Sequence, residues 1–89
     1  SFRSVESMLK VTVLFFASYR EQAKTTATMV EVPEGSNLAR VIDVVCESYP
    51  NITCPSQNIV AAINEEYKKH STIITQGDTI ALIPPVSGG

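Results

Sequence analysis

The sequence has few of the residues on which metal sites and nucleic-acid-binding surfaces depend. Its 89 residues include one histidine, two cysteines, four glycines and no tryptophan. Seven basic residues stand against nine acidic ones, which gives a net charge of −2. Such a balance supplies no positive field to attract a nucleic-acid backbone or an anionic bilayer. We therefore expect no nucleic acid and no membrane among the partners, and look for proteins or small molecules instead.

The sequence also has no long hydrophobic run. The apolar segment at residues 9–17 is far shorter than the roughly 20 residues that a membrane-spanning helix needs, and Lys10 and Thr12 interrupt it. Residues 1–7 contain no apolar signal core, so we interpret them as a vector scar or a disordered extension outside the fold. These features favour a cytosolic location.

No group of side chains has the spacing of a metal site or a catalytic centre. Cys46 and Cys54 form no close CxxC pair and have no histidine placed to complete a metal site, so we interpret them as structural thiols. His70 lies in a lysine-rich turn, where we predict a solvated loop residue. We expect no metal ion and no catalysis by the domain alone.

Two other patterns carry no chemistry. Glu65-Glu66 stands close to Lys68-Lys69, but near neighbours in a turn usually point apart, which predicts a solvated charge cluster. The sequence also lacks a glycine-rich phosphate-binding loop, because its internal glycines stand alone.

The first third of the chain has the alternation of β-strands. Apolar residues occupy every second position from Leu9 to Phe15, and both faces become apolar at the end of the run, which is typical of a strand in the middle of a sheet. Residues 18–25 are polar and are predicted to form a loop. Residues 26–32 alternate again before Pro33. We expect an antiparallel hairpin of these two strands.

The middle of the chain changes to the period of a helix. Residues 38–49 carry one apolar stripe at helical spacing, Ser36 is placed to cap the first turn, and Pro50 ends the segment. Residues 59–64 then predict a short buried strand, residues 64–71 a polar turn and residues 72–74 a brief edge strand. A turn at Gly77 leads into the last strand, residues 79–84. This order predicts an α+β roll with a sheet of four to five strands and one main helix packed across it.

The last residues, "IPPVSGG", place a rigid Pro84-Pro85 pair shortly before Gly88-Gly89. Proline fixes φ, whereas glycine has no Cβ and lets a backbone thread a narrow channel. A free carboxylate is a poor electrophile and needs activation, such as adenylation in another protein's active site. The pattern predicts a rigid base, a slender flexible tip and a reactive carboxylate at Gly89.

Four segments together resemble the small subunits of molybdopterin synthase, a family of sulfur-carrier proteins with the ubiquitin-like β-grasp fold. They are "KVTVLFFASYRE", "EVPEGSNLARVIDVV", "VAAINEEY" and, most specifically, "GDTIALIPPVSGG". The thiazole-synthesis carriers and the ubiquitin-related modifier share the terminal Gly-Gly but not the preceding Pro-Pro pattern. The resemblance implies a mixed-sheet β-grasp domain at residues 8–83 and a flexible reactive tail at residues 84–89.

The resemblance further implies a two-stage cycle. A ubiquitin-activating-type adenylyltransferase would use ATP to adenylate Gly89, and a sulfur donor would convert the adenylate to a thiocarboxylate. The charged carrier would then dock on the large synthase subunit and give its sulfur to cyclic pyranopterin monophosphate. No cofactor would be bound permanently. The expected assembly is a heterotetramer built on a dimeric large subunit, in which this chain donates sulfur and the partners supply the catalytic side chains.

The resemblance assigns roles to individual residues as well. Threading of the tail into the partner would involve Pro84, Pro85, Val86, Ser87 and Gly88. Docking beside the tail requires apolar anchors, for which the candidates are Phe15, Tyr67, Ile83 and Val86, and Phe15 and Ile83 could equally belong to the core.

Other functions remain open at this point. The chain could be a ubiquitin-like modifier whose Gly89 forms an isopeptide bond with a lysine, or a sulfur carrier for thiazole synthesis or tRNA thiolation. It could also be a structural interaction domain, which would not need the chemistry of the tail.

Overall fold

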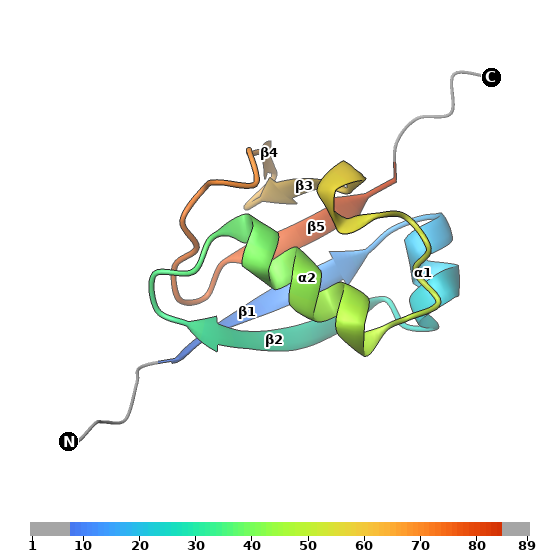
Figure 1. The fold of residues 1–89 in the computed structure, drawn as a ribbon, viewed down its shortest axis with the longest axis horizontal. Coiled ribbons are helices and arrows are strands. Elements are labelled where there is room, and N and C mark those ends of the chain that lie inside the picture. The colour runs from blue at the N-terminus through green and yellow to red at the C-terminus, as the bar shows by residue number, and fades with distance from the viewer. Residues whose placement is uncertain (1–7, 85–89) are drawn as a thin grey trace.

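The computed structural model describes residues 8–84, and the expected extension at residues 1–7 and most of the tail, residues 85–89, lie outside the described part. Its strands form one five-stranded sheet in the order β2-β1-β5-β3-β4 (Figure 1). The predicted roll, with a mixed sheet and one main helix across it, is confirmed. The elements in chain order are β1 (Met8–Phe15), α1 (Ser18–Ala23), β2 (Ala27–Pro33), α2 (Leu38–Ser48), the 3₁₀ turn η1 (Ser56–Asn58), β3 (Val60–Ile63), β4 (Glu66–Tyr67) and β5 (Thr79–Ile83).

Strand β1 lies in the middle of the sheet, as its apolar alternation predicts. It pairs antiparallel with β2 from Met8↔Pro33 to Leu14↔Ala27, which confirms the hairpin. On its other side it pairs parallel with β5, up to Phe15↔Leu82. Parallel strands end at the same edge of a sheet. The first strand and the last therefore finish side by side, and the tail begins at that edge (Figure 1).

The prediction of a loop at residues 18–25 is wrong, because helix α1 forms there. Tyr19 and Ala23 are both buried, and their spacing of four residues puts them on one face of the helix. Lys24 ends the helix in the left-handed region, at φ 62°, where its backbone N–H donates to the Arg20 carbonyl. Two buried positions among polar neighbours are too weak a periodicity to identify in the sequence.

Helix α2 is confirmed, but the predicted cap at Ser36 is wrong. The N-cap is Asn37, whose side chain accepts a hydrogen bond from the Arg40 backbone N–H at 3.0 Å. A capping side chain bonds the amide two or three positions into the helix, and Asn37 stands at that distance from Arg40. The Ser36 carbonyl instead accepts the Ile74 N–H at 2.9 Å. This bond joins the start of the helix to the chain segment that precedes β5.

The strand predicted at residues 59–64 is confirmed as β3, but the segments after it differ from the prediction. The polar turn contains strand β4, antiparallel to β3. The edge strand expected at residues 72–74 is absent from the described part of the chain, where Ile73 makes only an isolated bridge with Asn37. Strand β4 can pair with β3 because the chain reverses tightly at Asn64 and Glu65, whose φ angles are 53° and 76°. Positive φ at both central residues is the geometry of a two-residue hairpin turn.

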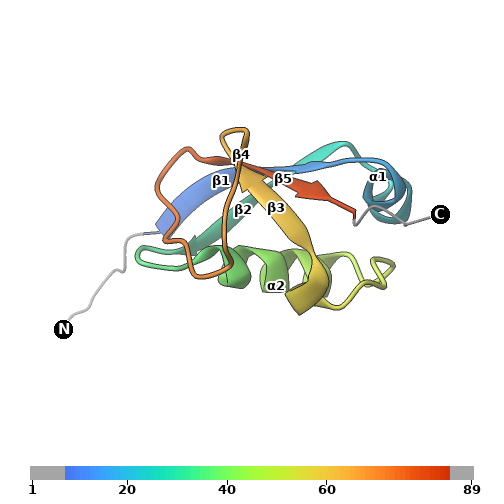
Figure 2. The same ribbon diagram turned by 90° about the horizontal axis from the view of Figure 1, so that it is seen from above.

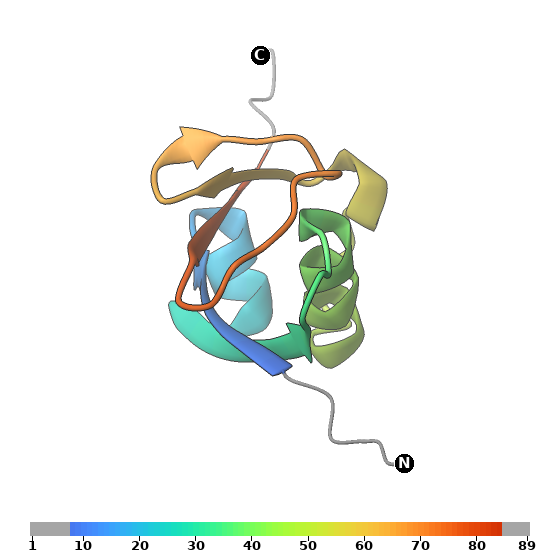
Figure 3. The ribbon, with the colours of Figure 1, turned by 90° about the vertical axis from the view of Figure 1, so that its left-hand side faces the viewer.

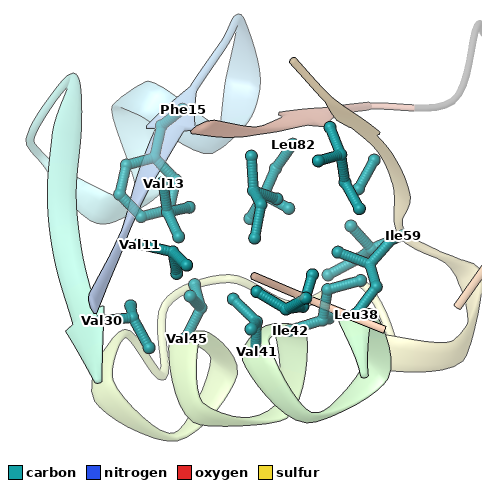
Figure 4. Packing of buried hydrophobic residues seen from close by; sticks show 14 of the residues in the cluster. Val11, Val13, Phe15, Val30, Leu38, Val41, Ile42, Val45, Ile59 and Leu82 are labelled. Atoms are coloured by element: carbon teal, nitrogen blue, oxygen red, sulfur yellow. The ribbon is translucent and has the colours of Figure 1, made fainter. Parts of the chain in front are cut away.

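The hydrophobic core lies between the sheet and α2. Figures 2 and 3 show α2 against one face of the sheet, while no helix covers the other face within residues 8–84. In Figure 4 the strands and the helix point their apolar side chains toward one another. The fully buried side chains include Val11, Val13, Phe15, Leu38, Val41, Ile42, Val45, Ile59, Ile80 and Leu82. No helix in the described segment is long and apolar enough to cross a membrane.

Candidate functional site

The tail that the sequence predicts to be reactive begins at the last described residue. Pro84 follows β5 directly and is half-buried. The other tail residues to which we assign roles, Pro85, Val86, Ser87, Gly88 and Gly89, lie outside the described residues. Their roles stay predictions, and the site is built here from the surface around Ile83 and Pro84.

Next to the root of the tail, the uncovered face of the sheet contains a hollow of about 520 Å³, which we call the outer hollow. Leu14 lines it from the end of β1, Phe16 from the position directly after β1, and Ile83 from the end of β5. These residues meet because β1 and β5 run parallel and finish together. The residues between 8 and 84 that line it are Leu14, Phe16, Ala62, Asn64, Glu65, Tyr67, Thr79, Ala81 and Ile83.

Large apolar side chains are exposed around the outer hollow. Phe16 is 43% exposed and Tyr67 is 70% exposed. An isolated apolar side chain on a surface needs no explanation, but several gathered in one concave area mark a site for a partner. The outer hollow is therefore a candidate docking surface, continuous with the root of the tail.

Among the predicted anchors, the structure brings Tyr67 and Ile83 together in the outer hollow. The interface role predicted for Phe15 is wrong, since Phe15 is 1% exposed and belongs to the core. Its ring packs edge to face against that of Tyr49, with the ring centroids 5.3 Å apart. Successive side chains of a strand point to opposite faces, so Phe16 lies on the outer face in its place. Phe16 and Leu14 are further site residues that were not predicted, although the apolar positions on both faces of the chain at residues 14–16 were a signal.

The rim of the outer hollow is held by a buried carboxylate. Asp78 accepts hydrogen bonds from the backbone N–H of Thr75 at 2.9 Å and from its hydroxyl at 3.0 Å. The Asn64 amide donates to the same carboxylate at 3.2 Å, and its carbonyl oxygen accepts the Thr79 N–H at 3.1 Å. These bonds fasten the β3–β4 turn to the start of β5. The predicted turn at Gly77 is confirmed, with φ 85°.

His70 is not the solvated loop residue that its neighbours predict. It is half-buried, and its Nε2 lies 2.7 Å from the Ile59 carbonyl, which can only accept, so Nε2–H donates. The His70 carbonyl in turn accepts the Ala39 N–H in the first turn of α2. His70 therefore has a structural role, in fastening the loop to the helix and to the chain before β3. The charge cluster beside it is solvated as predicted, with an exposed Lys68–Glu66 ion pair at 3.2 Å.

Both cysteines pack against the core as free, half-buried thiols. Burial raises the pKa of the Cys46 thiol, and the nearby Asp43 carboxylate raises it further. A raised pKa leaves less thiolate, which is the reactive and metal-binding form. Within residues 8–84, no three His, Cys, Asp or Glu side chains form a group that could hold a metal ion.

Comparison with known proteins identifies the family. The sequence model of the ThiS family matches residues 13–89. The chain is 35% identical over 83 residues to the molybdopterin synthase sulfur carrier subunit of Mycobacterium tuberculosis, a match that covers 92% of this chain and 100% of the relative. The corresponding subunit of Arabidopsis thaliana is 34% identical, with coverages of 93% and 86%.

Solved structures confirm the ubiquitin-like β-grasp fold. Small archaeal modifier protein 1 of Haloferax volcanii superposes with a TM-score of 0.79 at 21% identity, over 88% of this chain and 99% of that one. The ubiquitin of Caldiarchaeum subterraneum has a TM-score of 0.66 at 16% identity, over 93% of this chain and 100% of its own. The structural likeness is to the fold, while the sequence matches run through nearly the whole chain. The chain thus belongs to the ThiS family and, within it, to the molybdopterin synthase sulfur carrier subunits.

Proposed function

We propose that this chain carries sulfur as a thiocarboxylate on Gly89 and delivers it, within the molybdopterin synthase complex, to cyclic pyranopterin monophosphate. The observation that carries the proposal is that the family match runs to residue 89 and so includes the terminal Gly88-Gly89. The charging step uses ATP, and we place it in the cytosol.

The chemistry needs two partners in succession. In the activating enzyme the Gly89 carboxylate attacks the α-phosphate of ATP, which forms an acyl adenylate and releases pyrophosphate. A donor that supplies sulfur at the oxidation level of sulfide then displaces AMP, so that a C–S bond replaces the C–O bond to the phosphate. ATP is thus a substrate of the partner, and the proposal requires no cofactor bound to this chain. In the transfer the thiocarboxylate sulfur bonds to a carbon of the acceptor, and water then cleaves the C–S bond to Gly89, so that the sulfur stays on the acceptor and Gly89 returns to the carboxylate.

The tail suits delivery into a buried active site. Val86–Gly89 can span up to roughly 13–14 Å at about 3.3–3.6 Å per residue. Ordering a free segment costs about 1–2 kcal/mol of backbone entropy per residue, and the prolines reduce this cost because their φ is already fixed. Pro84, Pro85, Val86, Ser87 and Gly88 would thread the partner's channel.

We further propose that the outer hollow docks on the large subunit of molybdopterin synthase. Ile83 lines the outer hollow and directly precedes Pro84, so a protein that encloses the tail must also cover this surface. Phe16, Tyr67 and Ile83 would be the apolar anchors, and Val86 would continue the contact along the tail. Two copies of this chain on a dimeric large subunit would make the heterotetramer.

Intact mass spectrometry tests the proposal. The protein is incubated with ATP, magnesium, a matching activating enzyme and a sulfur source, with a chain lacking Gly88-Gly89 as the control. We expect a mass gain equal to the replacement of one oxygen by sulfur, located in the peptide that ends at Gly89 and absent from the control. The activating enzyme is first shown to charge another carrier. If the mass of this protein then stays unchanged, the result counts against the proposal.

The alternatives give different products in the same experiment. A ubiquitin-like modifier would form conjugates of higher mass through an isopeptide bond at Gly89. A carrier for thiazole synthesis or tRNA thiolation would acquire the thiocarboxylate but would fail to restore molybdopterin formation with the large subunit and cyclic pyranopterin monophosphate. The two assays together separate the three functions.

A further inference from the structure

The turn between β3 and β4 has an unfavourable residue at its second position. Asn64 and Glu65 both have positive φ, at 53° and 76°. A two-residue turn of this kind favours asparagine and then glycine, because asparagine tolerates the left-handed region and glycine has no Cβ to strain it. Asn64 follows this preference and Glu65 does not. The fold would be more stable with glycine at position 65.

The surrounding structure imposes this conformation on Glu65. The Asn64 side chain bonds both the Asp78 carboxylate and the Thr79 N–H, which fixes the turn in place. Backbone strain that the surroundings enforce is found most often at functional sites. The strain alone does not say what the function is, but it directs attention to the glutamate side chain.

The fold makes no visible use of the Glu65 carboxylate. Glu65 is exposed, and within residues 8–84 its carboxylate has neither an ion pair nor a hydrogen bond. Its neighbour Glu66 pairs with Lys68 at 3.2 Å. Among the described residues that line the outer hollow, Glu65 is also the one that carries a charge. An unpaired acid therefore stands at the rim of an apolar docking surface.

We propose that Glu65 is a specificity-determining residue, which accepts a lysine or arginine side chain of the large subunit while an apolar side chain next to it fills the outer hollow. This inference rests on the proposed function and adds the chemistry by which the partner is recognised. An apolar centre with a charged rim is the usual anatomy of a protein interface. A rim charge acts mainly on the association rate, through electrostatic steering. The strained turn keeps that charge beside Tyr67 and Phe16.

The experiment measures association and dissociation rates with the large subunit across a series of salt concentrations. Glu65→Gln removes the charge and keeps the size of the side chain. We expect its association rate to fall about three- to tenfold at low salt and to depend less on salt, with little change in dissociation. Glu65→Asp keeps the charge and should retain the salt dependence of the wild type. Glu34→Gln is the matched control. Glu34 is exposed and directly follows β2, at the end of the sheet opposite to the outer hollow.

A second variant separates recognition from folding. Glu65→Gly should raise the thermal midpoint, because it relieves the backbone strain, and yet lower the association rate as Glu65→Gln does. Unchanged association and salt dependence in Glu65→Gln would overturn the inference while the proposed function stood. If the wild-type chain itself failed to bind the large subunit, the docking part of the proposed function would be overturned first.

Discussion

The side-chain amide of Asn64 donates a hydrogen bond of 3.2 Å to the buried carboxylate of Asp78, and this bond joins the β3–β4 turn to the turn before β5. The two residues are 14 positions apart in the sequence, on opposite sides of the loop that contains His70. Their bond sets the position of one wall of the outer hollow relative to the strand that carries the tail. The shape of the candidate docking surface thus depends on a polar contact beneath its rim.

Replacing Asp78 should destabilise the fold. Asp78→Ala leaves the Thr75 N–H, the Thr75 hydroxyl and the Asn64 amide without their acceptor in a part-buried place, and we expect a loss of about 2–3 kcal/mol in the free energy of unfolding. Denaturant unfolding measures it. Asn64→Gly is the matched variant, because it keeps the backbone of the turn and removes only the side-chain bonds, and its loss should be smaller. Equal stability of Asp78→Ala and wild type would contradict this role.

Phe15 and Phe16 should respond in opposite ways. Phe15→Ala opens a cavity in the core and should cost about 3–5 kcal/mol of stability. Phe16→Ala removes a side chain that is 43% exposed, so its cost to stability should stay below about 1 kcal/mol, whereas binding to the large subunit should weaken. Denaturant unfolding and a titration with the large subunit measure the two effects. A weakly destabilising Phe15→Ala would show that the core assignment is wrong.

Stability should fall at alkaline pH. Burial raises the pKa of Tyr19 above its ordinary value of 10.0, and the Cys54 thiol raises it further, while burial and Asp43 raise the pKa of Cys46 above 9.0. Both groups then keep their protons in the folded chain at a pH where the unfolded chain has lost them. The stabilisation is complete below about pH 9 and is lost as the pH rises through the folded pKa values, with a slope of up to about 1.4 kcal/mol per pH unit for each group.

Denaturant unfolding from pH 7 to 11 measures how the free energy of unfolding depends on pH. Tyr19→Phe is the informative variant, because it removes one titrating group. Its free energy of unfolding should therefore fall less steeply at the upper end of the pH range. The Tyr19 hydroxyl is buried and has no hydrogen-bond partner within residues 8–84, and the Cys54 thiol near it is only a weak acceptor. Tyr19→Phe should therefore be neutral or slightly stabilising at pH 7. A curve for Tyr19→Phe as steep as that of the wild type would assign the pH dependence to other groups.

The last residue should matter for chemistry and not for stability. Gly89→Ala adds a methyl group next to the reacting carboxylate, and we expect slower charging or slower sulfur transfer, because the partner's channel must accept a Cβ. The thermal midpoint should not change, since Gly89 follows the last strand by several residues. Rates of thiocarboxylate formation and a thermal melt test both expectations. A lowered melting temperature would contradict this separation of roles.

Long, regular patterns in the sequence predicted the fold well. The alternation in β1 and the helical stripe of α2 each repeat often enough to identify an element, and both elements are confirmed. Helix α1 was missed because only Tyr19 and Ala23 mark its buried face. Strand β4 was missed because it is two exposed residues long, and only its pairing with β3 defines it.

For the candidate site, the sequence alone determined the chemistry that we propose, and the tertiary structure decided the geometry. Pro84-Pro85 and Gly88-Gly89 are identified from the sequence without any structure. Which of Phe15 and Phe16 faces a partner depends on which face of β1 the helix covers, and the sequence does not state that. The position of Glu65 beside Tyr67 and Ile83 likewise follows from strand pairing, because only folding places β3 between β4 and the distant β5.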